Sequence, residues 1–163
     1  MSFTEGSYEK ALIALFENLG YQHQYGPNIE RDYYVPFYEE QLIESLTTIN
    51  YGKPRPAIDE AISKLKDIEI GSLPQRNELF MDYLQHGIEV SFFDGKEQCN
   101  DIIYLIDYND KNIKRNDFKV INQWTFVENS EKRADIILFV NGLPLVVIEL
   151  KSPSREETNV SEA

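Results

Sequence analysis

The chain has 163 residues, 42% apolar and 12% aromatic, which is enough for one domain with a buried core and excludes a disordered tail. Sixteen basic residues against 28 acidic ones give a net charge of −12, which excludes nucleic-acid binding through a generally basic surface. The single cysteine excludes an internal disulfide framework, and no apolar run could span a bilayer. We therefore expect a cytoplasmic protein without membrane contact, whose nucleic-acid function, if any, depends on a local site, a metal ion or a partner.

The first half of the chain is predicted to be helical. Apolar side chains recur every three or four residues over 8–19, which indicates a helix that Ser7 caps and Gly20 ends. A polar, tyrosine-rich stretch follows it. The same apolar spacing then predicts three more helices, over 38–49, from near Pro56, and between Pro74 and Gly87.

The second half of the chain alternates with a period of two, which predicts strands. Turn signals stand at Asp94-Gly95 and, more strongly, at Asn141-Gly142. Five strands are predicted, over 88–93, 102–108, 118–127, 135–140 and 143–151.

Helices followed by strands indicate an α+β fold, or a mixed sheet with helices packed on it. We expect residues 1–151 to form one domain, with a helical part at about 1–87 and a sheet part at about 88–151. Residues 152–163 are expected to form a polar tail.

Three charged residues near the end of the last predicted hairpin suggest a site. Glu149 and Lys151 are two apart on one strand and share a face, and Asp135 opens the partner strand. Paired carboxylates, with the backbone carbonyl of Leu150, offer hard oxygen ligands to Mg²⁺ or Mn²⁺. Such an ion polarises a phosphodiester and lowers the pKa of bound water, which a lysine can orient or deprotonate. The trio predicts phosphodiester hydrolysis, although the pattern alone more often marks an exposed ion pair at a strand end.

The hairpin turn decides whether Asp135 joins the other two residues. A two-residue loop at Asn141-Gly142 pairs Asp135 with Ile148 and places it on the face opposite Glu149. A loop with an odd number of residues, or a bulge, restores Asp135 to the Glu149 face, and Gly142 can adopt the left-handed conformation that a bulged turn needs. We therefore predict an irregularity at this turn.

The stretch RADIILFVNGLPLVVIELKSP closely resembles the N-terminal nuclease domain of the R subunit of type I restriction–modification enzymes, which belong to the PD-(D/E)XK nuclease superfamily. The resemblance extends to EKALIALFENLGYQH, NELFMDYLQHGIEVSF and IYLIDYNDKNIKRNDFKVINQWTF, and so covers nearly the whole chain. It implies a restriction-endonuclease-like mixed sheet flanked by helices, with the catalytic hairpin near the C-terminus. Ala134 departs from the family, which usually has proline there.

The resemblance implies roles for the matching residues. Asp135 and Glu149 look like the metal-binding carboxylates, and Lys151 looks like the catalytic lysine. Glu9 resembles a further family glutamate that reaches toward the metal, and a solvated residue beside the helix stripe is an equally good interpretation.

Four other polar residues receive no catalytic role. Asn122 and Gln123 match family positions, but their role does not follow from the sequence. His23 and His86 are not spaced as metal ligands, so a polar role in a loop or at a helix end is favoured for both.

The resemblance also implies a cofactor and partners: Mg²⁺ or Mn²⁺, double-stranded DNA, methylation and specificity subunits, and ATP used only by a C-terminal DNA translocase. The chain contains neither a phosphate-binding Gly-rich loop nor the family's Gln-x-x-x-Tyr helix after the catalytic strand. We therefore expect a fragment that is weakly active or inactive in isolation. The alternatives are a stand-alone nuclease of the superfamily with another role, such as repair, and a non-catalytic docking module on the same fold.

Overall fold

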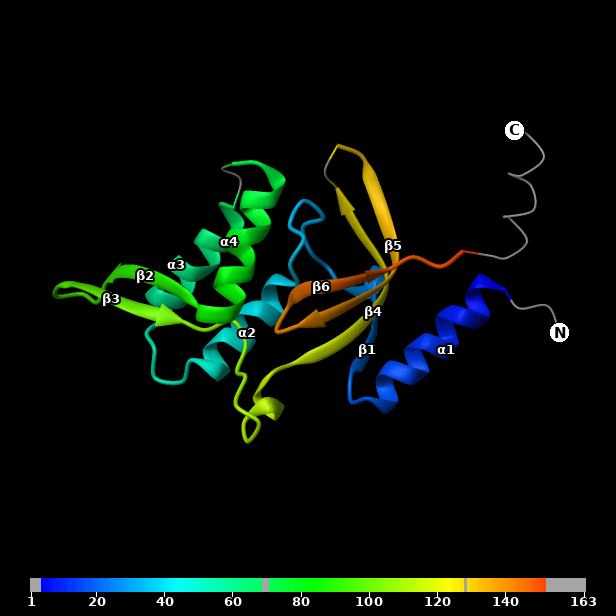
Figure 1. The fold of residues 1–163 in the computed structure, drawn as a ribbon, viewed down its shortest axis with the longest axis horizontal. Helices are drawn as coiled ribbons and strands as arrows, with labels where there is room; N and C mark the ends of the chain where they lie inside the picture. The colour runs from blue at the N-terminus through cyan, green and yellow to red at the C-terminus, as the bar shows by residue number, and fades with distance from the viewer. Residues whose placement is uncertain (1–3, 69–70, 128, 152–163) are drawn as a thin grey trace. The chain divides into compact units, whose positions relative to one another are not determined.

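The computed structural model describes residues 4–68, 71–127 and 129–151, and these belong to two compact units (Figure 1). Unit 1 comprises Met1–Pro36, Phe118–Phe139 and Pro144–Ala163, and unit 2 comprises Phe37–Asp117 and Val140–Leu143. The fold is α+β, as predicted, because each unit combines helices with strands. None of the described helices is both long and apolar enough to cross a membrane.

Unit 1 is built on a four-stranded mixed sheet with the strand order β1-β4-β5-β6. Strand β1 runs parallel to β4, and β5 and β6 form the hairpin predicted around Asn141-Gly142. The elements are α1 (Glu5–Asn18), β1 (Gln22–Tyr25), the short 3₁₀ helix η1 (Gly26–Asn28), β4 (Phe118–Val127), β5 (Glu131–Val140) and β6 (Leu143–Ile148).

Helix α1 covers one face of this sheet. Its Ile13 is buried in a cluster with Val120 of β4 and with Ile136 and Leu138 of β5. Four partly buried side chains pack against that cluster, namely Leu12, Phe16, Tyr21 and Ile148. The burial of these apolar side chains holds α1 to the sheet.

The buried face of α1 differs from the predicted one. Leu15 and Leu19 belong to the predicted stripe but are 51% and 66% exposed, whereas Ile13 is buried. The helix also begins earlier than predicted, because Thr4 is its N-cap and Ser7 lies three residues into the capping box. Leu12 and Phe16 of the predicted stripe do pack against the cluster, so the buried face is the predicted one turned toward Ile13. Glu9 lies one turn before Ile13 and therefore shares the buried face.

Unit 2 contains three helices and a two-stranded antiparallel sheet. The predicted helices are confirmed, and α3 packs on β2 through an apolar face that includes Ile58 and Leu65. The elements are α2 (Glu39–Ile49), α3 (Arg55–Lys66), α4 (Leu73–His86), β2 (Ile88–Phe93), β3 (Gln98–Ile103) and the 3₁₀ helix η2 (Ile113–Arg115).

The strand prediction missed β1, misplaced β3 and carried the last strand past the observed end of β6. The described residues form six strands instead of five, because β1 is a polar QHQY segment without apolar alternation. The strand predicted over 102–108 lies instead at Gln98–Ile103. It stops at Tyr104 because the side chain of Asn50 hydrogen-bonds both the N–H and the carbonyl of that residue, at 2.8 Å each. A side chain thus satisfies the backbone groups that a strand partner would otherwise take.

The turn between β5 and β6 is buried, unlike most hairpin turns. Asn141 is 0% exposed and has a φ of 53°, and Gly142 has a φ of 80°. The Asn141 amide donates to the Leu105 carbonyl and to Asn116 Oδ1, both at 2.8 Å, and its Oδ1 accepts the Asp117 N–H at 2.7 Å. Asn141 is therefore a buried structural residue as well as a turn former.

Gly142 is needed at the turn for space as well as for conformation. Its carbonyl accepts the N–H of Tyr38 at 2.9 Å, next to the start of α2. A Cβ on Gly142 would lie 2.5 Å from the backbone nitrogen of Leu42 and 2.6 Å from the carbonyl oxygen of Tyr38. Because both contacts are with backbone atoms, a side chain here would have to displace the first turn of α2.

Candidate active site

The end of the β5–β6 hairpin joins Asp135 to the segment that carries Glu149 and Lys151. Asp135 lies within β5, and its Oδ2 accepts the backbone N–H of Leu150 at 2.7 Å. A carboxylate that accepts a backbone N–H is held in one orientation. The structure therefore fixes Asp135 against the backbone of the residue that separates Glu149 from Lys151.

Glu149 responds to the charge of Asp135. The pKa of the Glu149 carboxyl is raised, first by partial desolvation and second by the negative charge of Asp135. Two carboxylates that interact in this way repel each other when both are ionised, and a divalent cation between them would relieve that repulsion. The carboxylate oxygens of Asp135 and Glu149 and the backbone carbonyl of Leu150 are hard donors, the kind of ligand that Mg²⁺ and Mn²⁺ prefer.

The turn is regular, so the prediction of a bulge or an odd-length loop there was wrong. Asn141 and Gly142 form a plain two-residue connection, both with positive φ, between Val140 and Leu143. A ladder running unbroken from this turn would place Ile148 opposite Asp135, on the same face. Ile148 instead packs against the cluster beneath α1.

The strand ends before the charged residues, which the sequence analysis did not foresee. Strand β6 stops at Ile148, so Glu149, Leu150 and Lys151 are not bound by the alternation of a strand. Glu149 therefore lies outside the strand alternation that would place it on the face opposite Asp135.

Lys151 is not joined to the two carboxylates in this structure. Its side chain is exposed, and it forms none of the ion pairs found in the described part of the chain. Its ammonium group is available to solvent and to a substrate.

Glu9 is held by two side-chain amides. Its Oε1 accepts the amide of Asn122 at 2.8 Å, and its Oε2 accepts the amide of Gln123 at 2.7 Å. Glu9 is half-buried, so the interpretation as a simply solvated residue is wrong. Asn122 and Gln123, which had no role from the sequence, thus contact the glutamate that the family resemblance singled out.

His23 extends this arrangement on β1. Its Nε2 lies 2.9 Å from Oδ1 of Asn122. His23 is paired with Val120 in the parallel β1–β4 ladder, so Asn122 is its diagonal neighbour on the same face. This contact could not be predicted from the sequence, because β1 is a polar segment without apolar alternation.

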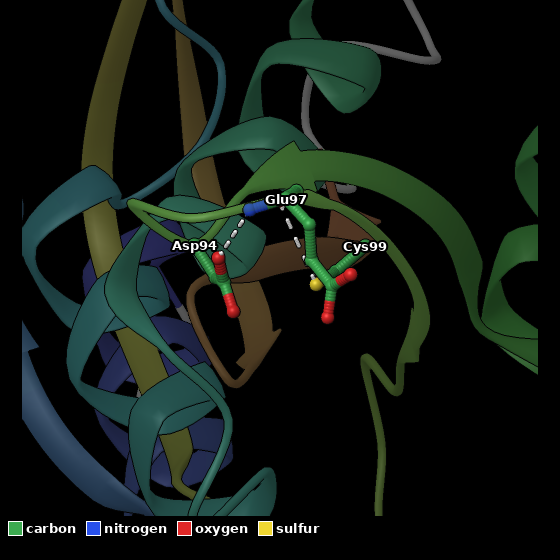
Figure 2. A group of neighbouring side chains, drawn as sticks. All are labelled: Asp94, Glu97 and Cys99. Atoms are coloured by element: carbon green, nitrogen blue, oxygen red, sulfur yellow. Dashed lines mark hydrogen bonds between the residues drawn. The ribbon is translucent and has the colours of Figure 1, made fainter.

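Another acidic group gathers more tightly, at the β2–β3 turn (Figure 2). Among the residues that the structure describes, Asp94, Glu97 and Cys99 are the group of three potential ligand side chains whose ligand atoms all lie within 4.8 Å of one another. Glu9, Asp135 and Glu149 do not form such a group over the same ranges.

The oxygen of Asp94 is already used within that turn. Asp94 Oδ1 accepts the N–H groups of Lys96 and Glu97, at 2.8 and 2.9 Å, and these bonds lower the pKa of Asp94. Desolvation, followed by the charge of Asp94, raises the pKa of Cys99, which favours the protonated thiol over the thiolate that binds metals. The group closes a turn and is the weaker candidate for a metal site.

Comparison with known proteins identifies the family. The family described as type I restriction enzyme R protein N terminus matches residues 2–163. The chain is 30% identical, over 98% of its length, to the type I restriction enzyme HindI endonuclease subunit of Haemophilus influenzae, and 31% identical, over 91%, to the EcoprrI endonuclease subunit of Escherichia coli. It is 28% identical, over 92%, to the putative MjaIXP endonuclease subunit of Methanocaldococcus jannaschii.

The chain spans a minor part of each of these relatives: 16% of the H. influenzae protein, 15% of the M. jannaschii protein and 44% of the E. coli protein. The matches nevertheless run across both structural units and include the hairpin that carries Asp135 and Glu149. The chain belongs to the family of type I restriction enzyme R protein N-terminal regions.

Proposed function

We propose that this chain is the endonuclease domain of a type I restriction enzyme R subunit, and that it hydrolyses phosphodiester bonds of double-stranded DNA with Mg²⁺ or Mn²⁺. The observation that carries the proposal is the pairing at the hairpin end. Asp135 accepts the Leu150 N–H, and its charge raises the pKa of Glu149. Within a family of restriction enzyme subunits, two interacting carboxylates beside an exposed lysine are the groups that this chemistry needs.

The proposal assigns metal binding to the two carboxylates and a separate task to Lys151. Asp135 and Glu149, with the carbonyl of Leu150, would hold the metal ion. When bound, the ion supplies Lewis acidity and lowers the pKa of a coordinated water. The Leu150 N–H orients the Asp135 carboxylate. Lys151, exposed and outside the ion pairs of the described residues, would neutralise charge on the phosphate or orient the water.

The acidity of the chain bears on how DNA reaches the site. A net charge of −12 opposes binding to a polyanion, so the affinity must come from elsewhere. In the proposed complete enzyme, the ATP-driven translocase of the R subunit and the partner methylation and specificity subunits would hold and select the DNA. The bound cation would supply the local positive charge at the scissile phosphate.

The test is substitution in the complete enzyme, with Glu149→Ala and Lys151→Ala each purified in the natural complex. Cleavage of double-stranded DNA should be lost while ATP hydrolysis and translocation are retained, because the substitutions remove only the hydrolytic groups. Glu97→Ala, at the other acidic group, is the matched control and should cleave normally. Retained cleavage in either active-site variant would rule out the assignment.

A further inference from the structure

The carboxylate of Glu9 is held by two side-chain hydrogen bonds, one to each of its oxygens. One amide from Asn122 and one from Gln123 each donate to a different oxygen of Glu9, across the contact between α1 and β4. Hydrogen bonds to an ionised acceptor are stronger than neutral ones, and two donors on two oxygens fix the plane of the group. The position of Glu9 is thus set by β4 as well as by its own helix.

The backbone of β4 departs from a regular strand to make this grip possible. Consecutive residues of a strand point to opposite faces, yet Asn122 and Gln123 both reach Glu9. Gln123 has a φ of 56°, a left-handed conformation that is unusual for a residue other than glycine. Strain of this kind persists where the surroundings enforce it and often marks a functional site.

Gly26 makes room for this irregularity. A Cβ on Gly26 would lie 2.8 Å from the carbonyl oxygen of Gln123 and 2.9 Å from that of Asn122. The 3₁₀ helix η1, which begins at Gly26, can therefore lie directly against the distorted part of β4. Gly26, the left-handed backbone of Gln123 and the amides of Asn122 and Gln123 thus all contribute to holding the Glu9 carboxylate.

The contacts of Asn122 also determine which atom donates and which accepts in each hydrogen bond. Glu9, when ionised, can only accept, so Asn122 must present its NH₂ group to Glu9 and its Oδ1 to His23. His23 Nε2 must then carry a hydrogen. The chain of contacts runs from His23 through Asn122 to Glu9, with one consistent assignment of donors.

The same core links Glu9 to the proposed site. Glu9 lies one turn from Ile13 on α1, Asp135 adjoins Ile136, and Glu149 adjoins Ile148. Ile13 and Ile136 belong to the cluster beneath α1, and Ile148 packs against it. The elements that carry the three carboxylates, α1, β5 and β6 with the segment that follows it, thus pack on a single cluster.

We propose that Asn122 and Gln123 are positioning residues that hold the Glu9 carboxylate for the metal site of Asp135 and Glu149, and that His23 positions Asn122. The inference rests on the proposed function, since it assigns Glu9 to that metal site. A purely structural tie between α1 and β4 would not need the strained backbone at Gln123.

The decisive variant is Gln123→Gly, measured in the natural full-length protein by Mn²⁺ titration calorimetry and thermal unfolding. Glycine tolerates the left-handed backbone, so the unfolding temperature should not fall. Loss of the amide should weaken Mn²⁺ binding about 10–100-fold, the usual effect of removing a partner that orients a ligand. Asn122→Ala should weaken it similarly, and Gln22→Ala, on the exposed part of β1, should not change it.

The role of His23 is tested by loss and rescue. His23→Ala should weaken Mn²⁺ binding by less than Asn122→Ala, because it acts one contact further away. His23→Gln keeps an N–H donor that can reach Asn122 and should restore the affinity. If His23→Ala matches the wild type in Mn²⁺ affinity, or if the glutamine variant does not restore it, His23 is not a positioning residue.

Two further variants separate this inference from the proposed function. If Asp135→Asn abolishes Mn²⁺ binding and Glu9→Gln leaves it unchanged, the positioning inference is overturned and the nuclease assignment stands. If Asp135→Asn also leaves binding unchanged, the metal site itself is wrong. Wild-type affinity in Gln123→Gly and Asn122→Ala, with weakened binding in Glu9→Gln, would show that Glu9 is a ligand that the amides do not position.

Discussion

Two hairpins of the molecule, β2–β3 and β5–β6, each gather acidic side chains, but they use them differently. In the β2–β3 hairpin of unit 2, Asp94 lies at the turn and accepts the N–H groups that close it. In the β5–β6 hairpin, the acids lie at the open end, where Asp135 accepts one N–H and raises the pKa of Glu149. The pKa of Asp94 is lowered, whereas that of Glu149 is raised.

This difference shows that closeness of acidic groups is a poor guide to a metal site. The tighter group has an oxygen that already accepts two backbone N–H groups and a thiol whose pKa is raised by desolvation and by the charge of Asp94. The looser pair has a mutual repulsion that a cation would remove. The hydrogen bonds that the carboxylate oxygens already accept are therefore a better guide to a metal site than the distances between the oxygens.

The largest expected effect compares one acid from each hairpin. Asp135→Asn should weaken Mn²⁺ binding by more than the roughly 10–100-fold lost with an outer partner of a metal site, because it removes a direct ligand. Asp94→Asn should leave Mn²⁺ binding unchanged. Calorimetric titration of both variants checks this, and a loss of affinity only in Asp94→Asn would reverse the assignment of the two hairpins.

A smaller effect compares the glycines of the two turns. Gly142→Ala should lower the free energy of unfolding by about 3 kcal/mol, since its Cβ would overlap the backbone of α2 in addition to the left-handed strain. Gly95 has a φ of 99° and no atom near its Cβ position, so Gly95→Ala should cost only about 1 kcal/mol. Denaturant unfolding measures both, and equal losses would contradict the buried turn.

The smallest effect is a shift in one titration. In Asp135→Asn, the pKa of Glu149 should fall part of the way to its ordinary value, since partial desolvation, the larger cause, remains. A raised folded-state pKa means that ionised Glu149 disfavours the fold, and this penalty disappears as the pH falls through that pKa. Asp94 behaves oppositely, because its lowered pKa adds stability that is lost on acidification.

Carboxyl ¹³C titration by NMR follows both residues in the same sample. The Asp94 titration should be unchanged in Asp135→Asn and serves as the internal control. An unmoved Glu149 titration would show that Asp135 does not act on it.

The helices of unit 2 and the β5–β6 hairpin could be predicted because their signals are local. Apolar spacing placed α2, α3 and α4, and Asn141-Gly142 placed the turn. Strand β1 could not be predicted, because its four polar residues are strand only by pairing with β4, far along the chain. The end of β3 was equally hidden, since it depends on the side chain of Asn50.

The candidate site was predictable in its members but not in its geometry. The residue types and the family resemblance indicated Asp135, Glu149 and Lys151. The end of β6 at Ile148 and the hydrogen bond from Leu150 to Asp135 could not be predicted, because both depend on tertiary contacts. The hydrogen bond from Gln123 to Glu9 depends on the left-handed backbone of Gln123, which the neighbouring sequence does not indicate.

The buried turn has a consequence for the order of folding. A hairpin closed by Asn-Gly is usually among the first structures to form, because its contacts are local. Here the turn is complete only when Asn141 meets Leu105 and Asn116 and when Gly142 accepts the Tyr38 N–H. These are distant contacts that carry a large loop-closure cost. We expect the strands that carry the proposed nuclease residues to become ordered late, after the helices of unit 2, so that the hydrolytic groups assemble only on a chain that has already folded.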